Sequence, residues 1–298
     1  MHYVYTNDLL NHNQFGFTPK KSTTDATMPV KQFAEEWLRQ GLITILVSLD
    51  VKRAFDAAWW PCILKKLQDF NCPRNLYYLA KSYLSQRTAV MTTNSLQIVR
   101  EVSKGCPQGS CCGPGLWNIQ HNSLLNLEFR KQTEVIAFAD DLLIVVKADS
   151  IRGTENITNI QMNKVLTWAK NNKLKFNEQK SNFMVISRRK RKENKEMSVY
   201  MNNKILEQVK KIKYLGIIID SKLKFRQYIM YISSKYNKLI HAFSKSAKQS
   251  WELSTQPCTL YTKEQFYHSC CTERLYESRH WRKNATKQFT TEYSALWT

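Results

Sequence analysis

The sequence lacks any apolar run long enough to cross a lipid bilayer, which takes about 20 residues in a helix. Its start, MHYVYTNDLLNHNQ, lacks the basic and apolar regions of a secretory signal. The 8 cysteines contain no paired CxxC spacing, so free thiols in a reducing compartment are expected. No internal repeat is visible. These absences predict a soluble, intracellular protein with no membrane partner, and they leave nucleus or cytoplasm undecided.

Acidic residues are scarce relative to basic ones, because 24 Asp and Glu stand against 45 Lys and Arg and give a formal net charge of +21. Such an excess draws a protein toward a polyanion, and nucleic acid is a better candidate than an anionic membrane surface. The 298 residues are 43% hydrophobic, enough to bury a sizeable core in one large domain or two smaller ones. The chain is therefore expected to be globular and to bind nucleic acid.

Apolar periodicity predicts helices mixed with short strands, which is the α+β class. Helices are expected at residues 27–41, 61–70, 74–86, 116–131, 153–171 and 226–251. Strands are expected at residues 42–50, 181–187, 197–201 and 210–220, hairpins at 88–102 and 133–147, and a Gly- and Pro-rich loop at 105–115. The predicted buried stripe of the helix at 153–171 consists of Ile157, Ile160, Val165 and Trp168.

Two adjacent aspartates, Asp140 and Asp141, lie inside the apolar hairpin VIAFADDLLIVV, and Asp50 ends the apolar run LITILVSLD. A sheet that pairs these strands would gather three carboxylates at one edge, where like charges raise one another's pKa unless a cation is bound. Carboxylate oxygens are ligands that Mg²⁺ and Mn²⁺ prefer, and two such ions about 3.5 to 4 Å apart can clamp both reacting oxygens of a phosphoryl transfer. With the basic surplus, the acids predict nucleotidyl transfer. An ordinary Asp-rich turn remains the alternative for the pair alone.

Six motifs follow one another along roughly residues 13 to 250: NQFGFTPKKSTTDA, VSLDVKRAFDAAWW, KGCPQGSCCGPGLWNI, IAFADDLLIVV, NNKLKFNEQKSNFMVIS and KIKYLGIIID. In this order and spacing they resemble the reverse transcriptase of non-LTR (LINE-type) retrotransposons, the group that includes the R1 and jockey elements. The resemblance implies a right-hand polymerase, with a palm of antiparallel sheet backed by helices, partial fingers and the start of a helical thumb. It implies an RNA-directed DNA polymerase that uses an RNA template, a DNA primer, dNTPs and two Mg²⁺ or Mn²⁺ ions.

The resemblance also implies roles for individual residues. The metal ligands would be Asp50 and Asp140, with Asp141 completing the acidic cluster, and Lys180 would donate a proton to the departing pyrophosphate. The nucleotide would meet Val51, Phe55, Gln108 and Gly109, and the Phe55 ring would exclude a 2′-hydroxyl. The primer end would be held by the YLG turn, which is Tyr214, Leu215 and Gly216. Taken singly, Phe55 fits a core position and Lys180 fits solvent.

The resemblance divides the chain into expected regions. Residues 1–28 would be a remnant of the fingers, 29–219 the palm with a fingers-type insertion at about 62–102, and 220–253 the start of the thumb. The family's Arg-Pro-Ile fingers segment and endonuclease domain are expected to be missing, and Thr18 stands where the family usually has arginine. The basic segments TPKKS and RRKRK would contact template and primer backbones, although a solvated loop is equally open for RRKRK.

The resemblance stops after about residue 253, where the chain becomes rich in Cys, His and aromatic residues. A metal knuckle from Cys258, His268, Cys270, Cys271 and His280 does not match the usual zinc spacings. Permitted codons for Lys263 to Tyr276, read in a shifted frame, can instead spell GAILPLLLYGAPV, which resembles the family's segment at this point. We therefore expect a frameshift near residues 253–262 and an out-of-frame or disordered tail at 254–298. A decayed, inactive element copy that at most binds nucleic acid is the alternative function, and the oligomeric state stays open.

Overall fold

The computed structural model describes residues 1–93, 96–107, 109–188 and 197–247. The chain forms two compact units, Met1–Phe225 and Arg226–Thr298. The tip of the hairpin expected at 88–102, Gln108, most of RRKRK and the tail expected to be frameshifted lie outside the described residues. Within the described residues, no helix is both long and apolar enough to cross a membrane.

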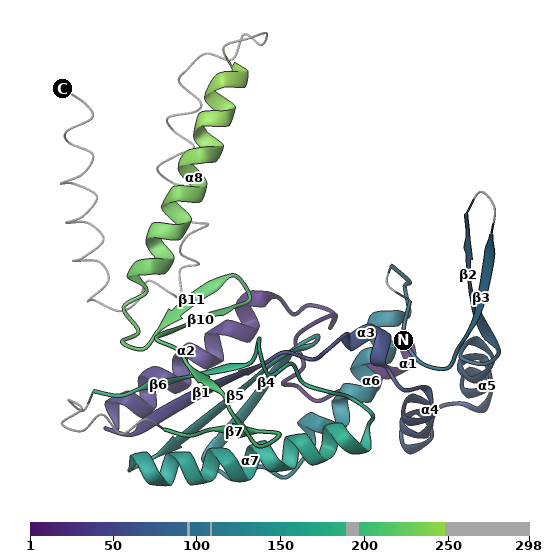
Figure 1. Ribbon diagram of the computed structural model, residues 1–298, viewed down its shortest axis with the longest axis horizontal. Coiled ribbons are helices and arrows are strands. Elements are labelled where there is room, and N and C mark those ends of the chain that lie inside the picture. The colour runs from purple at the N-terminus through teal and green to yellow at the C-terminus, as the bar shows by residue number, and fades with distance from the viewer. Residues whose placement is uncertain (94–95, 108, 189–196, 248–298) are drawn as a thin grey trace. The chain divides into compact units, whose positions relative to one another are not determined.

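A five-stranded sheet in the order β4-β5-β1-β6-β9 forms the centre of the first unit (Figure 1). Its strands are β1 (Ile43–Leu49), β4 (Thr133–Phe138), β5 (Asp141–Ala148), β6 (Asn182–Ile186) and β9 (Glu207–Gln208). All neighbours pair antiparallel except β6 and β9, which are parallel. The two central strands are apolar along nearly their whole length because both of their faces are covered. This mainly antiparallel sheet with helices confirms the predicted α+β class.

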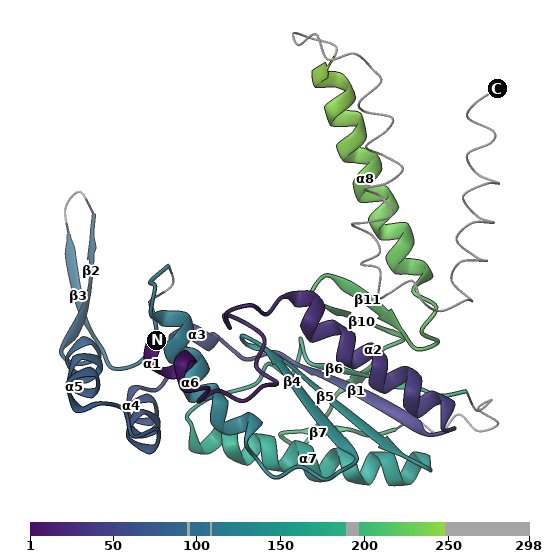
Figure 2. The same cartoon turned by 180° about the vertical axis from the view of Figure 1, so that it is seen from behind.

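Two long helices lie along the sheet (Figures 1 and 2). Helix α2 (Thr23–Arg39) contacts β1 and β4, and α7 (Ile151–Asn171) contacts β5 and β1. Helix α2 begins four residues before the predicted start, because Ser22 and Asp25 form a reciprocal capping box ahead of Pro29. Gly41 follows the helix with a φ of 74°, a conformation that glycine adopts without strain, as expected for a stop signal.

The remaining elements of the first unit are short. Its other helices are α1 (His2–Thr6), α3 (Ala54–Ala57), α4 (Trp60–Asp69), α5 (Arg74–Tyr83) and α6 (Gly113–Leu125). Its hairpins are β2 (Arg87–Thr92) with β3 (Gln97–Val102), β7 (Tyr200–Met201) with β8 (Lys204–Ile205), and β10 (Lys211–Tyr214) with β11 (Ile217–Asp220). The second unit contributes α8 (Arg226–Ala247). Helix α6 ends at Leu125, six residues before the end predicted at Lys131. Its first turn contains Pro114, at a position where the backbone N–H has no partner within the helix and its absence costs nothing.

The buried face of α7 differs from the predicted stripe. Ile160 is 40% exposed, whereas Thr154, Thr158 and Gln161 are fully buried together with Val165, and Trp168 is 6% exposed. The threonines tolerate burial because each hydroxyl donates to a carbonyl of the preceding turn, at 2.7 Å in both cases. The polarity of these side chains concealed the true face, so the prediction for Ile160 was wrong.

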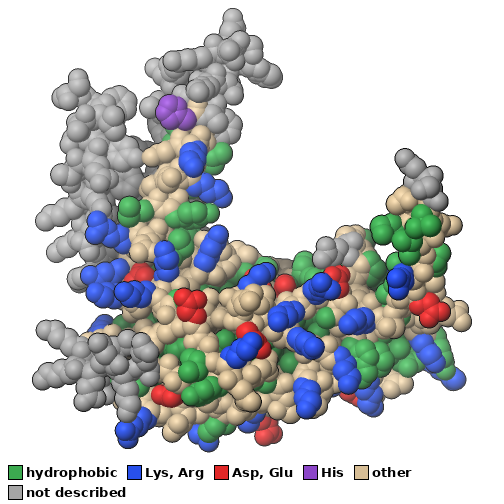
Figure 3. Space-filling model, in the orientation of Figure 1, with side chains coloured by type: hydrophobic (Ala, Val, Ile, Leu, Met, Phe, Trp, Pro, Cys, Tyr) green, Lys and Arg blue, Asp and Glu red, His purple; other side chains and the backbone are tan. Residues whose placement is uncertain are grey.

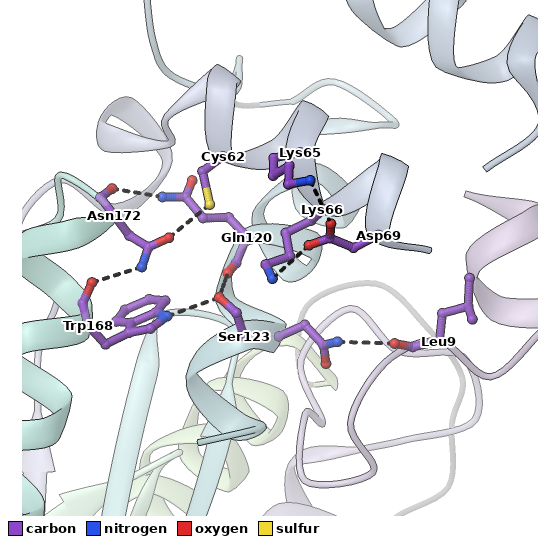
Figure 4. A network of polar contacts seen from close by, with 10 residues as sticks. Leu9, Cys62, Lys65, Lys66, Asp69, Gln120, Ser123, Trp168 and Asn172 are labelled. Carbon is purple, nitrogen blue, oxygen red and sulfur yellow. Dashed lines mark hydrogen bonds and ion pairs between the residues drawn. The ribbon is translucent and has the colours of Figure 1, made fainter. Parts of the chain in front are cut away.

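Polar side chains join α6 to the ends of α4 and α7 (Figure 4). Gln120 donates to the Asn172 carbonyl at 3.2 Å, and the Cys62 thiol donates to the Asn172 side chain at 2.8 Å. The Trp168 indole donates to the Ser123 hydroxyl at 3.0 Å. These bonds fix the point at which the chain leaves α7, just before the segment that pairs with the end of β1.

His121 is the central polar residue of this core. It is fully buried between Trp117 and Trp168, with ring centroids 5.4 and 5.7 Å away, and neither ring nitrogen has a hydrogen-bond partner. Burial disfavours the charged imidazole and lowers the His121 pKa from 6.5 to about 4. His121 is therefore a neutral packing residue, and protonating it opposes folding.

Replacing His121 with Phe should remove part of the protein's sensitivity to acid. Between about pH 6.5 and pH 4 the unfolded chain binds this proton and the folded chain does not, so wild-type stability falls as the pH is lowered. The pKa shift corresponds to about 3 kcal/mol in the free energy of unfolding. This stability is fully present above pH 6.5 and is lost as the pH falls to about 4. Urea unfolding of wild type and His121→Phe at about pH 7.5 and pH 5 measures the difference. His2→Phe provides the control, because it makes the same change of side chain at an exposed position.

Candidate active site

Strand register brings the predicted acids to one end of the sheet. The last pair of β1 and β5 is Leu49 with Leu142, so Asp50 and Asp141, the next residues outward, lie at the same end of adjacent strands. Phe138 pairs with Asp141, which leaves a two-residue turn formed by Ala139 and Asp140. A one-residue change of register would send these side chains to opposite faces, so the apolar pattern of both strands fixes the cluster.

The electrostatics of the cluster are those of crowded carboxylates. Burial raises the pKa of Asp140, the charge of Asp50 raises it further, and a backbone hydrogen bond and Lys180 lower it. Asp141 is exposed by surface area, yet nearby protein atoms still remove part of its hydration and raise its pKa, as do the charges of Asp140 and Asp50. A cation would relieve this repulsion, and hard oxygen donors suit a divalent one.

The three carboxylates interact through their charges, but they do not yet converge on one point. Within the described residues, no group of three or more His, Cys, Asp or Glu side chains has the geometry to hold a metal ion. The donor set fits Mg²⁺ or Mn²⁺ chemically, because all three side chains are oxygen donors with rotatable bonds. Ion binding at this end of the sheet therefore requires the carboxylates to turn toward a common centre.

The backbone of Asp50 is held by the segment after α7. Its N–H donates to the Ser181 hydroxyl at 3.2 Å, and its carbonyl accepts from Asn177 N–H at 2.7 Å. Val51 forms a bridge with Phe176, and the side chain of Val51 is 4% exposed. The Val51 side chain thus belongs to the core.

Phe55 lies on α3, which follows Arg53 in the left-handed conformation (φ 51°). Its ring is half-buried, with centroids 6.0 Å from Phe17 and 5.9 Å from Trp117. Cys106 N–H donates to the Phe55 carbonyl at 2.7 Å and ties the Gly-rich loop to α3. In that loop Gly109 has a φ of 81° and open space where a side chain would begin, so its backbone is accessible to a ligand.

The remaining predicted residues lie near the acids. Lys180 is exposed, and its charge reaches Asp140. Tyr214 is 2% exposed, its hydroxyl has no hydrogen-bond partner, and burial and the charge of Asp141 raise its pKa. Leu215 (φ 47°) and Gly216 (φ 86°) form the turn between β10 and β11. The structure thus brings both strand-borne acid segments together with Lys180 and Tyr214.

Three residues that support the site carried no motif-based prediction of their own. The Gln14 side chain accepts a hydrogen bond from Ala139 N–H, the Trp117 indole donates to the Ala139 carbonyl, and Ser181 binds Asp50. Gln14 stands between Asn13 and Phe15 in NQFGF, so the local sequence does not distinguish its buried bonding from that of a surface amide.

The profile of the family described as "Reverse transcriptase (RNA-dependent DNA polymerase)" matches residues 2–219. The chain belongs to the reverse transcriptase family. The acids discussed above all lie inside the matched region, at the end of the central sheet. The family predicted from the six motifs is therefore confirmed.

Curated relatives of this reverse transcriptase are proteins of LINE-type elements. The chain is 27% identical over 83% of its length to the "Retrovirus-related Pol polyprotein from type-1 retrotransposable element R1" of Bradysia coprophila, and covers 24% of that protein. It is 26% identical over 80% of its length to the "RNA-directed DNA polymerase from mobile element jockey" of Drosophila melanogaster, and covers 26% of it. The chain thus spans about a quarter of the length of these relatives. The two matches confirm the resemblance to the R1 and jockey group.

Solved telomerase structures share the fold. Telomerase from Candida albicans, in complex with a fragment of telomeric RNA, aligns with 74% of this chain and 36% of its own at a TM-score of 0.53 and 12% identity. Apo telomerase from Candida tropicalis, truncated from its C-terminal domain, aligns with 68% of this chain and 39% of its own at a TM-score of 0.50 and 11% identity. Together with the mainly antiparallel sheet, these likenesses confirm the predicted palm-like polymerase fold.

Proposed function

We propose that this chain performs RNA-directed DNA synthesis for a LINE-type retrotransposon, by two-metal transfer of a nucleotide from a dNTP to the 3′-hydroxyl of a DNA primer. The observation that carries the proposal is the register of β1 and β5, which puts Asp50 next to the Asp140–Asp141 turn in a chain of the reverse transcriptase family. Nucleotidyl transfer needs charge neutralisation and alignment of the two reacting groups, and clustered carboxylates supply both once they hold divalent ions.

The acids would act as ligands in this reaction. Asp50 and Asp140 would hold two Mg²⁺ or Mn²⁺ ions, and Asp141 would complete the cluster. When bound, the ions supply Lewis-acid activation of the primer hydroxyl and neutralise charge on the phosphates. The primer hydroxyl would lose its proton to solvent as its oxygen forms a bond to the α-phosphorus, while the bond from that phosphorus to the pyrophosphate oxygen breaks. Lys180, whose charge reaches Asp140, would give a proton to the departing pyrophosphate.

Other side chains would position the reactants. Phe55 would lie under the incoming sugar and exclude a 2′-hydroxyl, a role supported by its half-buried ring between Phe17 and Trp117. Gly109, and Gln108 beside it, would let the loop backbone approach the nucleotide. The turn formed by Tyr214, Leu215 and Gly216 would hold the primer end. Most of the catalysis in this scheme is positioning and charge stabilisation.

Template and primer would be bound mainly through their phosphates. The net charge of +21 supports this, and Figure 3 shows Lys and Arg side chains spread over the visible face of the first unit. Residues 29–219 would serve as the palm, with the insertion at about 62–102 acting as fingers. The division of the chain after Phe225 supports a thumb that begins near residue 220.

Primer extension on an RNA template tests the proposal directly. With Mg²⁺ the purified protein should lengthen an annealed DNA primer, EDTA should abolish extension, and excess Mg²⁺ should restore it. A binding assay on the same primer–template runs in parallel. Binding of the primer–template without extension when Mg²⁺ is present would refute the polymerase proposal and favour an inactive, basic nucleic-acid-binding fragment.

A further inference from the structure

The turn that carries Asp140 contains a backbone conformation that needs support. Ala139 has a φ of 58°, in the left-handed region that residues with a Cβ atom seldom adopt. It lies between Phe138, the last residue of β4, and Asp140. Because Ala139 sets the direction in which the chain enters Asp140, a relaxation of Ala139 would redirect that carboxylate.

Gln14 holds the N–H of this residue. Its side chain is 1% exposed, and its Oε1 accepts from Ala139 N–H at 3.1 Å and from Gly16 N–H at 3.0 Å. The segment around it pairs with the edge of β4, since Phe15 N–H donates to the Ala137 carbonyl at 2.9 Å. The Nε2 of Gln14 has no hydrogen-bond partner, so the side chain acts here only as an acceptor.

The next peptide group, between Ala139 and Asp140, is also held. The Trp117 indole, buried in α6, donates to the Ala139 carbonyl at 3.1 Å. Gly16 packs directly on the turn, because a Cβ added there would lie 2.1 Å from Ala139 N. Both polar backbone groups of the buried Ala139 therefore end on buried side chains from other parts of the chain, and two peptide groups in succession are fixed just before Asp140.

We propose that Gln14 is a positioning residue for catalysis, whose Oε1 fixes the Phe138–Ala139 peptide and so holds the Asp140 backbone where its carboxylate can turn toward the metal ions. Gln14 does not touch the reacting atoms in this scheme. The inference rests on the proposed polymerase function and goes beyond it, because it assigns to the QFGF motif a role in the geometry of the acids. Groups that orient metal ligands typically change metal affinity or activity by about 10- to 100-fold when removed.

Two substitutions at Gln14 and one elsewhere separate positioning from folding. Gln14→Met keeps the length of the side chain and removes the acceptor, whereas Gln14→Glu keeps an acceptor oxygen at a site whose burial favours the neutral acid, and so changes mainly the atom that has no partner. Gln161→Met is the matched control, since Gln161 is also fully buried but has no hydrogen-bond partner for either side-chain atom.

Gln14→Met should lower kcat by about 10- to 100-fold and raise the Mg²⁺ concentration needed for half-maximal extension, while the KM for primer–template stays near wild type. Gln14→Glu should restore kcat to within a few-fold, and Gln161→Met should resemble wild type. Gln14→Met with unchanged kcat and Mg²⁺ dependence would overturn the proposal. A loss of kcat that accompanies a lowered unfolding temperature and is not restored by Gln14→Glu would also overturn the proposal.

A second measurement keeps this role distinct from the polymerase activity itself. Binding of Mn²⁺, followed by its electron paramagnetic resonance signal, needs no turnover. Gln14→Met should weaken Mn²⁺ binding by about tenfold relative to wild type and Gln161→Met. If wild type binds Mn²⁺ but extends no primer, the proposed function fails and this comparison still decides the role of Gln14. Equal Mn²⁺ affinity in all three proteins, or no binding by wild type, would refute it.

Discussion

Asp140→Asn is expected to lower the rate of primer extension by about 10³-fold or more. A catalytic ion stabilises charge in the transition state by several kcal/mol, and each 1.36 kcal/mol is about a factor of ten in rate. Asparagine keeps the size of Asp140 but not its charge, so the cluster would hold its ions more weakly. Single-turnover extension on an RNA template, over a range of Mg²⁺ concentrations, measures the loss.

The same substitution should not destabilise the metal-free protein. Burial and the charge of Asp50 raise the Asp140 pKa, so the ionised carboxylate opposes folding and a neutral amide removes that opposition. Asp69→Asn is the control, because Asp69 lies on α4 in surface ion pairs with Lys65 and Lys66 that are worth little. Extension that persists in Asp140→Asn, or is lost equally in Asp69→Asn, contradicts a metal-binding role for Asp140.

The sequence was sufficient to predict which acids lie at the same end of the sheet. An apolar run that ends on Asp50 and a hairpin with Asp140 at its turn can pair in few registers that keep both strands buried. The bonds that hold these acids could not be predicted in this way. Gln14 and Ala139 are 125 residues apart, and Asp50 and Ser181 are 131 apart. A hydrogen bond between such distant residues leaves no periodicity or spacing in the chain.

Burial of polar residues caused the clearest error. The apolar pattern of α7 assigned Ile160 to the core, but Thr154, Thr158 and Gln161 are buried in its place. Periodicity treats every hydroxyl and amide as a surface group, although a threonine that bonds its own helix can be buried at little cost. Several buried polar residues of α6 are satisfied in another way, because they bond to backbone groups of neighbouring segments, as Gln120 does with Asn172. The polar supports of an active site are thus the residues that hydrophobic patterns miss.

Trp117→Ala is expected to lower the free energy of unfolding by about 3 to 5 kcal/mol, the usual cost of emptying a buried aromatic site. Trp117 is fully buried, and its ring packs between Phe55 and His121 with centroids 5.9 and 5.4 Å away. The substitution also removes the indole that donates to the buried Ala139 carbonyl. Denaturant unfolding followed by circular dichroism measures the change.

Trp59→Ala is the matched control for this loss. Trp59 is only partly buried and has Lys173 over its ring at 5.8 Å, so its removal should cost less than that of Trp117. Equal losses in the two variants would contradict the packing described for α6. Trp117→Ala should also weaken the acid sensitivity assigned to His121, because a cavity beside the imidazole admits water and lets it bind a proton in the folded state. One side chain would then govern both the packing beside Phe55 and the protonation of the core.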